Sequence, residues 1–251
     1  MNSLERSLLE KIGYDNGWEV VATQNPDSLT LASARHSAAV TITTVSQGPR
    51  YLLGFPDWIL DSELTRSSPC SAERGLILVK DEEDLASVLH RAGQLASSLP
   101  SSPVIVYEDF VAEILDEDPS QRGTEREAIV RLRVGQDVYR QALLEYWQGR
   151  CAVTGIGVPE VLRASHAKPW ADCQHDHERL NVYNGFLLNA TLDALFDKGL
   201  ISFSDSGEGN VSSLVPEDQY GLLGLNHFSL RWIAEAHRPF LEWHRTYVFQ
   251  K

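Results

Sequence analysis

The sequence is poor in cysteine, and its cysteines are not paired. Three of them, Cys70, Cys151 and Cys173, are scattered over 251 residues. An odd number at such spacing argues against a disulfide framework and predicts reduced thiols in a cytoplasmic protein. Long apolar runs are absent as well, since none approaches the roughly 20 residues of a membrane helix. The opening "MNSLERSLLEKIGYDNG" carries acids and a helical pattern, which a signal peptide does not. We therefore expect no membrane partner.

Positive charge is also scarce. The chain has 22 Lys and Arg against 35 Asp and Glu, which leaves a net charge of −13. Nearly all of the excess of acidic over basic residues lies in residues 1–125, whereas the rest of the chain is close to neutral. An acidic chain does not attract nucleic-acid phosphates through its overall charge, so any such contact must be local.

The first part of the chain has the pattern of a small α+β domain, residues 1–118. Ser3 is a candidate cap for a helix whose apolar residues recur at Leu4, Leu8 and Ile12. An amphipathic helix is expected to start at Asp81. Short strands are expected at "WEVVATQ", "SLTLASAR", "SAAVTITTV", "PRYLLGF" and "SPVIVYE".

A polar segment, residues 116–125, is the best candidate for a linker to a second domain, residues 119–251. Two helices are predicted next, "EREAIVRLRVG" and "QDVYRQALLEYWQG", with Gly135 between them. The runs "CAVTG" and "EVLRASH" then predict a β-hairpin. A polar loop, a helix in "NATLDALFDKG" and an exit strand at residues 200–203 follow. "SLRWIAEAHRPFLEWHRTYVF" is expected to be a C-terminal helix.

Several residues of this second domain suit phosphodiester hydrolysis. A base that takes a proton from water near neutral pH is best supplied by histidine, and His166 stands at the end of a predicted strand. A divalent cation prefers carboxylate oxygens. Asp193 and Asp197 are four residues apart, so they share a helix face. Asn184 stands in a turn, where its amide can brace the loop.

Four blocks in this order resemble the HNH endonucleases: "GQDVYRQALLEYWQGRCAVTG", "LRASHAKPW", "NVYNGFLLNATLDALFDKGLISF" and "RPFLEWHRTYVF". More narrowly, they resemble the branch with a Ser-His first motif that occurs in bacterial restriction and anti-phage effector proteins. The resemblance covers about residues 124–250. It implies a ββα-metal fold with one divalent cation held between hairpin and helix.

The resemblance also implies roles for individual residues. His166 matches the catalytic base, and Asn184 matches the catalytic asparagine that braces the loop. Asp193 falls where the family supplies a metal ligand, and Asp197 where some members supply a second. Ser165 departs from the pattern, because many members have Asp or His there as a ligand. The expected cofactor is Mg²⁺, with Mn²⁺ and Ni²⁺ as alternatives.

A zinc site is a competing interpretation of the loop. Cys173, His175 and His177, with the distant Cys151, could in principle supply four ligands. Their spacing matches no common zinc motif, so a solvated loop is favoured and no structural zinc is expected.

Nucleic-acid contacts are predicted at Lys168 and Arg140, with Arg131 and Arg133 as weaker candidates. The alternative interpretation is that these side chains are exposed to solvent and bind nothing. The tryptophans are expected to be core residues rather than platforms for stacked bases.

Two functions follow from these patterns. The first is a metal-dependent endonuclease acting on DNA, double-stranded in the first instance, in restriction or anti-phage defence. Its N-terminal domain would recognise DNA or a signal. The second is a non-catalytic binding protein on an HNH scaffold, which the Ser165 departure supports. A homodimer, and a small-molecule or modified-base ligand of the N-terminal domain, are partner alternatives left open.

Overall fold

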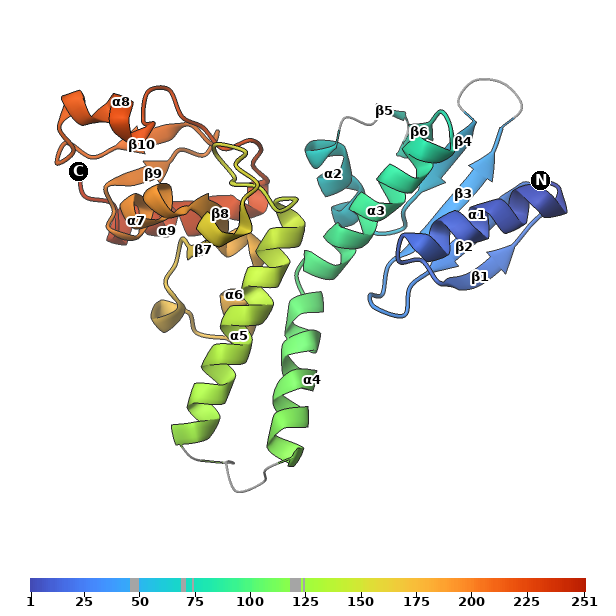
Figure 1. The fold of residues 1–251 in the computed structure, drawn as a ribbon, viewed down its shortest axis with the longest axis horizontal. Coiled ribbons are helices and arrows are strands. Elements are labelled where there is room, and N and C mark those ends of the chain that lie inside the picture. The colour runs from blue at the N-terminus through green and yellow to red at the C-terminus, as the bar shows by residue number, and fades with distance from the viewer. Residues whose placement is uncertain (46–49, 69–70, 74, 118–122, 124) are drawn as a thin grey trace. The chain divides into compact units, whose positions relative to one another are not determined.

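The computed structural model describes the chain except for residues 46–49, 69–70, 74, 118–122 and 124. The described residues form two compact units, Met1–Ser97 and Ser98–Lys251. The predicted α+β class is confirmed, because the first unit holds an antiparallel sheet with helices and the second a β-hairpin followed by a helix (Figure 1). Most of the expected linker lies outside the described residues. A functional boundary between residues 118 and 119 stays a prediction.

The first unit is built on an antiparallel sheet with the strand order β1-β2-β3-β4-β6-β5. Buried and half-buried residues alternate along β2, β3 and β4, so one face of the sheet contributes to the core. The elements are α1 (Ser3–Asp15), β1 (Val20–Gln24), β2 (Ser28–Ala32), β3 (Ala39–Thr44), β4 (Tyr51–Gly54), α2 (Trp58–Ser67), β5 (Ser71–Glu73), β6 (Leu76–Val79) and α3 (Glu82–Ser98).

Local signals explain the helices of this unit. The side chain of Asn2, rather than Ser3, caps α1 by accepting from Glu5 N at 2.8 Å. Asp81 accepts from Asp84 N at 2.9 Å at the start of α3, as its position predicted. Gly13 lets α1 approach β2 closely, because a Cβ there would overlap the Leu31 side chain.

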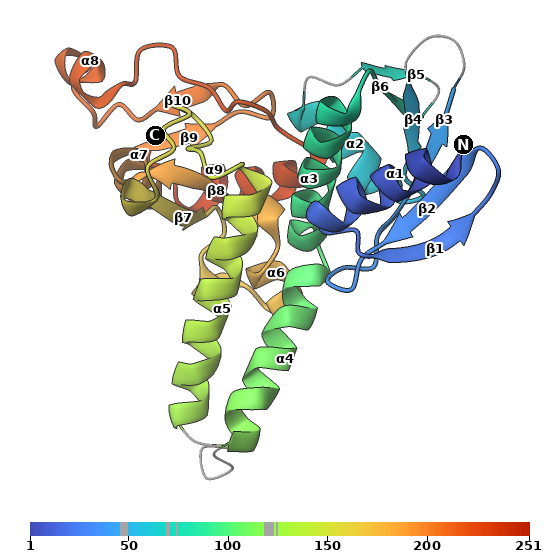
Figure 2. The ribbon, with the colours of Figure 1, turned by 45° about the vertical axis from the view of Figure 1, so that its right-hand side comes forward.

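The second unit joins a helical hairpin to the segment that holds His166. Helices α4 and α5 lie side by side and run antiparallel in both views (Figures 1 and 2). The elements are α4 (Ser102–Glu117), α5 (Glu125–Tyr146), β7 (Leu162–His166), α6 (Asp176–Arg179), β8 (Gly185–Asn189), α7 (Ala190–Asp197), β9 (Ile201–Phe203), β10 (Gly209–Val211), α8 (Tyr220–Leu223) and α9 (Arg238–Tyr247). Among the described helices, none combines the length and the hydropathy of a membrane span.

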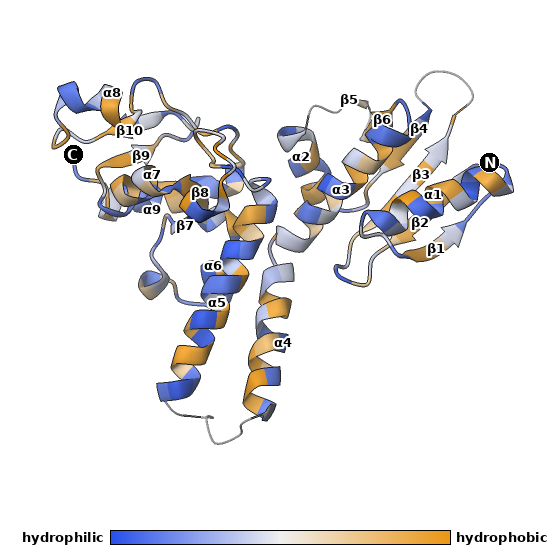
Figure 3. Cartoon of the chain, viewed as in Figure 1, coloured by the Kyte–Doolittle hydropathy of each residue, from blue (hydrophilic) through white to orange (hydrophobic). Residues whose placement is uncertain are grey.

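The strand expected at "SPVIVYE" is wrong, because these residues begin α4. The buried residues Val104, Tyr107, Val111 and Leu115 recur at intervals of three and four, which is the period of a helix. Figure 3 shows hydrophobic residues continuing along α4 well beyond the first turns. The seven-residue apolar run was too short to distinguish the two periods.

The expected break at Gly135 is also wrong, since α5 is one continuous helix. Gly135 is buried, and a Cβ at this position would overlap the indole of Trp170. The glycine therefore serves a close contact between α5 and the loop after β7 rather than the end of a helix.

The predicted hairpin has a different first strand. "CAVTG" forms a turn in which Gly155 N donates to Cys151 O at 3.0 Å, and β7 pairs instead with β8. The C-terminal helix is shorter than expected, because α9 begins at Arg238 with Pro239 in its first turn. The helix at residues 190–197 and the exit strand β9 are confirmed.

Candidate functional site

The β7–β8 hairpin positions His166. The two strands pair antiparallel, and His166 lies opposite Gly185. Gly185 is needed at this point, because a Cβ would overlap both Ser165 O and the Tyr139 hydroxyl. The start of β8 can therefore lie directly against the end of β7, and the imidazole stands at that end.

Three neighbours surround the His166 imidazole. Nε2 lies 2.8 Å from Arg179 O. A carbonyl only accepts, so Nε2 carries the proton and Nδ1 keeps the lone pair. The Tyr139 ring stacks on the imidazole with centroids 3.8 Å apart, and Trp170 meets it edge-on at 5.9 Å. The ring is thus held by one stacked ring, one edge-on ring and one hydrogen-bonded nitrogen.

Burial lowers the pKa of His166 to about 4, against the opposing effect of its hydrogen bond to Arg179 O. The imidazole is therefore neutral at pH 7. A neutral ring with Nδ1 unprotonated can accept a proton from water.

Asn184 ties the polar loop together. It is fully buried, and its Oδ1 accepts from Lys168 N at 2.8 Å. Its Nδ2 donates to Lys168 O and Glu178 O, both at 3.1 Å, and lies 3.3 Å from Cys173 Sγ. The neighbouring Arg179 O is the acceptor of His166 Nε2, so the asparagine supports the loop that orients the histidine.

Helix α7 presents the two predicted carboxylates. Asn189 caps it by accepting from Thr191 N and Leu192 N at 3.1 and 3.0 Å. Its apolar side, Leu192, Leu195 and Phe196, is buried. Asp193 and Asp197 therefore share the remaining side of a short helix that packs against β7.

Ser165 is directly connected to this helix. It is buried, and its hydroxyl donates a hydrogen bond to Asp193 Oδ1. Consecutive strand residues point to opposite sides, so Ser165 faces Asp193 while His166 faces elsewhere. The serine at the position where a ligand was expected thus orients a predicted ligand.

Asp197 lies with His166 on a pocket of about 320 Å³, which Trp170 and His244 also line. Burial, followed by the negative charge of Asp193, raises the pKa of Asp197 to about 6. Two carboxylates that repel each other on one helix face are a suitable pair for a dication. The structure thus places His166 and Asp197 on one pocket, whereas Asp193, on the same helix, does not line it and is hydrogen-bonded to Ser165.

A divalent cation fits these residues in part. Mg²⁺ keeps several waters and is commonly held by one or two carboxylates, which Asp193 and Asp197 can supply. Within the described part of the chain, no three His, Cys, Asp or Glu side chains gather as a ready metal site. Water and substrate oxygens would have to complete the coordination.

Comparison with protein families assigns this region. Residues 151–204 match the family described as HNH endonuclease. This segment is an HNH endonuclease domain. It contains β7, β8, α7 and β9, together with His166, Asn184 and both aspartates. No curated protein matches the chain.

The HNH domain implies nuclease activity and a nucleic-acid substrate, and HNH nucleases generally use a divalent metal. The match confirms the resemblance for residues 151–204. The matched segment begins after α5 and ends before α9. Helix α5 thus lies outside the match, although it packs against both strands of the hairpin.

The two cations predicted to contact nucleic acid have internal partners. Lys168 Nζ lies 2.6 Å from Glu178, and only 14% of its side chain is exposed. Arg140 donates to Leu162 O and Pro159 O at 2.9 and 3.1 Å, at the start of β7. Both stabilise the HNH domain, and a phosphate contact by either stays a prediction.

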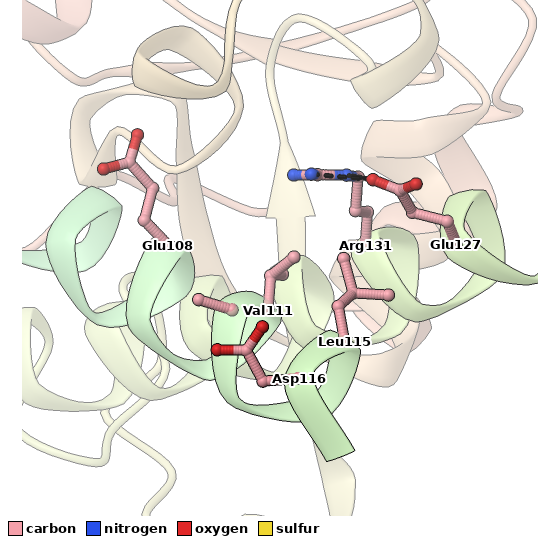
Figure 4. Close-up of a pocket in the computed structure, with 7 residues that line it drawn as sticks. Glu108, Val111, Leu115, Asp116, Glu127 and Arg131 are labelled. Atoms are coloured by element: carbon pink, nitrogen blue, oxygen red, sulfur yellow. Dashed lines mark hydrogen bonds and ion pairs between the residues drawn. The ribbon is translucent and has the colours of Figure 1, made fainter. Parts of the chain in front are cut away.

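A second pocket, of about 480 Å³, lies between α4 and α5 (Figure 4). Val111, Ala112 and Leu115 give it an apolar part, and Arg131 Nε donates to Glu127 at 2.8 Å. Arg131 is thus paired within the hairpin. None of the four predicted catalytic or metal residues lines this pocket, so the smaller pocket beside His166 is the candidate active site.

Sequence reasoning missed three members of the site. Tyr139 and Trp170 contact His166, and Ser165 was recognised only as a departure from the family pattern. Gly135 was the available signal, because a glycine inside a helical pattern often marks a close approach. Nothing in the sequence names Trp170 as the residue that approaches it.

Proposed function

We propose that this chain is a metal-dependent HNH endonuclease of the Ser-His branch that hydrolyses phosphodiester bonds in double-stranded DNA. The observation that carries the proposal is the position of the His166 imidazole. Its Nε2 donates to Arg179 O, and the same side chain lines a pocket with Asp197. A base and an acidic cation-binding group at one cavity are the components that hydrolysis needs.

The chain's own residues have distinct tasks in this scheme. Nδ1 of His166 takes the proton of the attacking water, while Arg179 O accepts from Nε2 and stabilises the imidazolium that results. Asn184 holds the loop, and Ser165 orients Asp193. Asp193 and Asp197 would hold the divalent cation, which supplies charge neutralisation at the phosphate.

The biological setting follows from the same proposal. A nuclease unit that reads little sequence needs a partner domain, and residues 1–118 would recognise a DNA feature or a signal, in restriction or anti-phage defence. The acidity of that region argues against direct phosphate binding and favours a signal, a small ligand or self-association.

Plasmid nicking tests the proposed base. With Mg²⁺ or Mn²⁺ present, wild type should convert supercoiled DNA to open circles, and His166→Ala should lower the rate by at least about 100-fold, because general base catalysis contributes roughly that much. His177→Ala is the matched control, since this exposed histidine lies in α6, between β7 and β8. Full activity of His166→Ala in a folded protein would eliminate His166 as the base.

Calorimetric titration with Mn²⁺ separates this function from a non-catalytic HNH scaffold. Wild type should bind the cation, and Asp193→Ala should bind it much more weakly. Asp218→Ala, an exposed acid outside the HNH domain, should bind like wild type. Absence of divalent binding in wild type would favour the non-catalytic alternative.

A further inference from the structure

Tyr139 belongs to α5, outside the segment that matches the HNH family, yet it contacts the proposed catalytic base. We propose that Tyr139 is a positioning residue of the active site, whose ring holds the His166 imidazole in the orientation that keeps Nε2 on Arg179 O. The proposal rests on the function proposed above and adds a part of the chain to the catalytic unit.

The stacking contact is closer than ordinary core packing requires. The two ring centroids are 3.8 Å apart and the planes differ by 18°, so the rings overlap face to face. Tyr139 is almost completely buried, which fixes its own ring in turn. A rotation of the imidazole about its bond to Cβ would drive it into the tyrosine ring and break the 2.8 Å hydrogen bond to Arg179 O.

The tyrosine hydroxyl connects the stack to the hairpin. It donates to Asn184 O at 3.1 Å, and the same oxygen accepts from Ala167 N at 2.9 Å. Burial raises the pKa of Tyr139 well above its usual value, so the hydroxyl stays a donor. Without the hydroxyl, Asn184 O would still accept from Ala167 N. We therefore expect loss of the ring to disturb His166 more than loss of the hydroxyl.

A second contact from α5 acts on the same histidine. The indole of Trp170 packs against the bare backbone of Gly135 and meets the imidazole edge-on. Gly135 and Tyr139 are four residues apart and share one face of α5. One turn of this helix therefore bounds the imidazole directly through Tyr139 and indirectly through Trp170.

Nicking kinetics of full-length variants test the role of the ring. Tyr139→Phe keeps the stack and should stay within about 3-fold of wild type, whereas Tyr139→Leu should lower kcat by about 10- to 100-fold with little change in KM, because a small misplacement of a catalytic group has effects of this size. Tyr139→Met fills the space without a flat ring and replaces the leucine variant if that variant does not fold. Equal kcat for the wild type and a folded leucine or methionine variant would overturn the proposal.

Nitrogen-15 NMR of the imidazole gives a readout independent of cleavage. Wild type and Tyr139→Phe should show one tautomer with the proton on Nε2, and Tyr139→Leu should show a mixture. Tyr146→Leu removes another buried tyrosine of α5 and should keep the wild-type tautomer, which separates positioning from general destabilisation. A single Nε2–H tautomer in folded Tyr139→Leu would overturn the proposal. Undiminished cleavage by folded His166→Ala would instead eliminate the proposed base and would leave the tautomer measurement unaffected.

Discussion

Ser165 shows how one hydroxyl can support a proposed metal ligand without itself binding metal. A serine oxygen is a weak ligand, but here it donates to a carboxylate of α7 and so restricts the rotation of Asp193. The His166 imidazole on the next residue is restrained in a similar way, by a backbone carbonyl and two aromatic rings. At this scale the site consists of groups whose orientation depends on their neighbours.

Replacing Ser165 by alanine should weaken divalent binding. The substitution removes the donor to Asp193 Oδ1 and lets the carboxylate rotate, and loss of such supporting contacts typically costs about 10-fold or more in metal affinity. Mn²⁺ titration calorimetry measures the effect, with the exposed Ser213→Ala as control. An unchanged Mn²⁺ affinity would show that the serine does not orient Asp193.

Helix α5 contacts two different parts of the second unit along its length. Its first turns form the hairpin with α4, and its later turns pack on β7 and β8. Gly135 stands between these parts, in contact with Trp170, where any larger residue would push the indole away. In an exposed helix the same glycine would be a destabilising choice relative to alanine.

Gly135→Ala should therefore destabilise the protein in spite of the higher helix propensity of alanine. Overpacking typically costs about 1–3 kcal/mol, against a gain of about 1 kcal/mol from propensity. Thermal unfolding should show a lower Tm, and the nicking rate should fall as Trp170 shifts against His166. Gln136→Ala, at the exposed neighbouring position, should leave both unchanged. A higher Tm in Gly135→Ala would show that Trp170 moves aside without cost.

Across the second unit, two histidines are held neutral in the folded state. His244 is buried, with Nε2 at 3.1 Å from Phe196 O and Nδ1 at 3.0 Å from Ser202 Oγ. Burial lowers the pKa of His244 to about 4, as it does for His166. The pKa of Asp197 shifts in the opposite direction, because burial raises it to about 6.

These shifts predict how stability depends on pH. A histidine with a lowered pKa binds its proton more readily when unfolded, so its contribution to stability is present above about pH 6.5 and falls toward pH 4, by at most about 1.4 kcal/mol per pH unit. The raised pKa of Asp197 partly offsets this fall, since the folded state takes up its proton first. Chemical denaturation across this pH range should show that the free energy of unfolding falls less for His244→Gln than for wild type. If the free energy of unfolding falls equally with pH in both proteins, His244 does not titrate as its burial implies.

The sequence by itself determined the class of fold and the identity of the HNH domain. Periodicity located α1, α3 and α7, because local capping and spacing suffice there, and the residue types around His166 indicated the chemistry. The helical period of α4 is also present in the sequence but extends beyond the seven-residue run that suggested a strand. Only the tertiary structure decided that α5 is continuous and that β7 pairs with β8, since these depend on contacts between distant residues. It also brought Tyr139 to His166, Ser165 to Asp193 and Trp170 to Gly135, because contacts between residues so far apart in the chain leave no periodic signal.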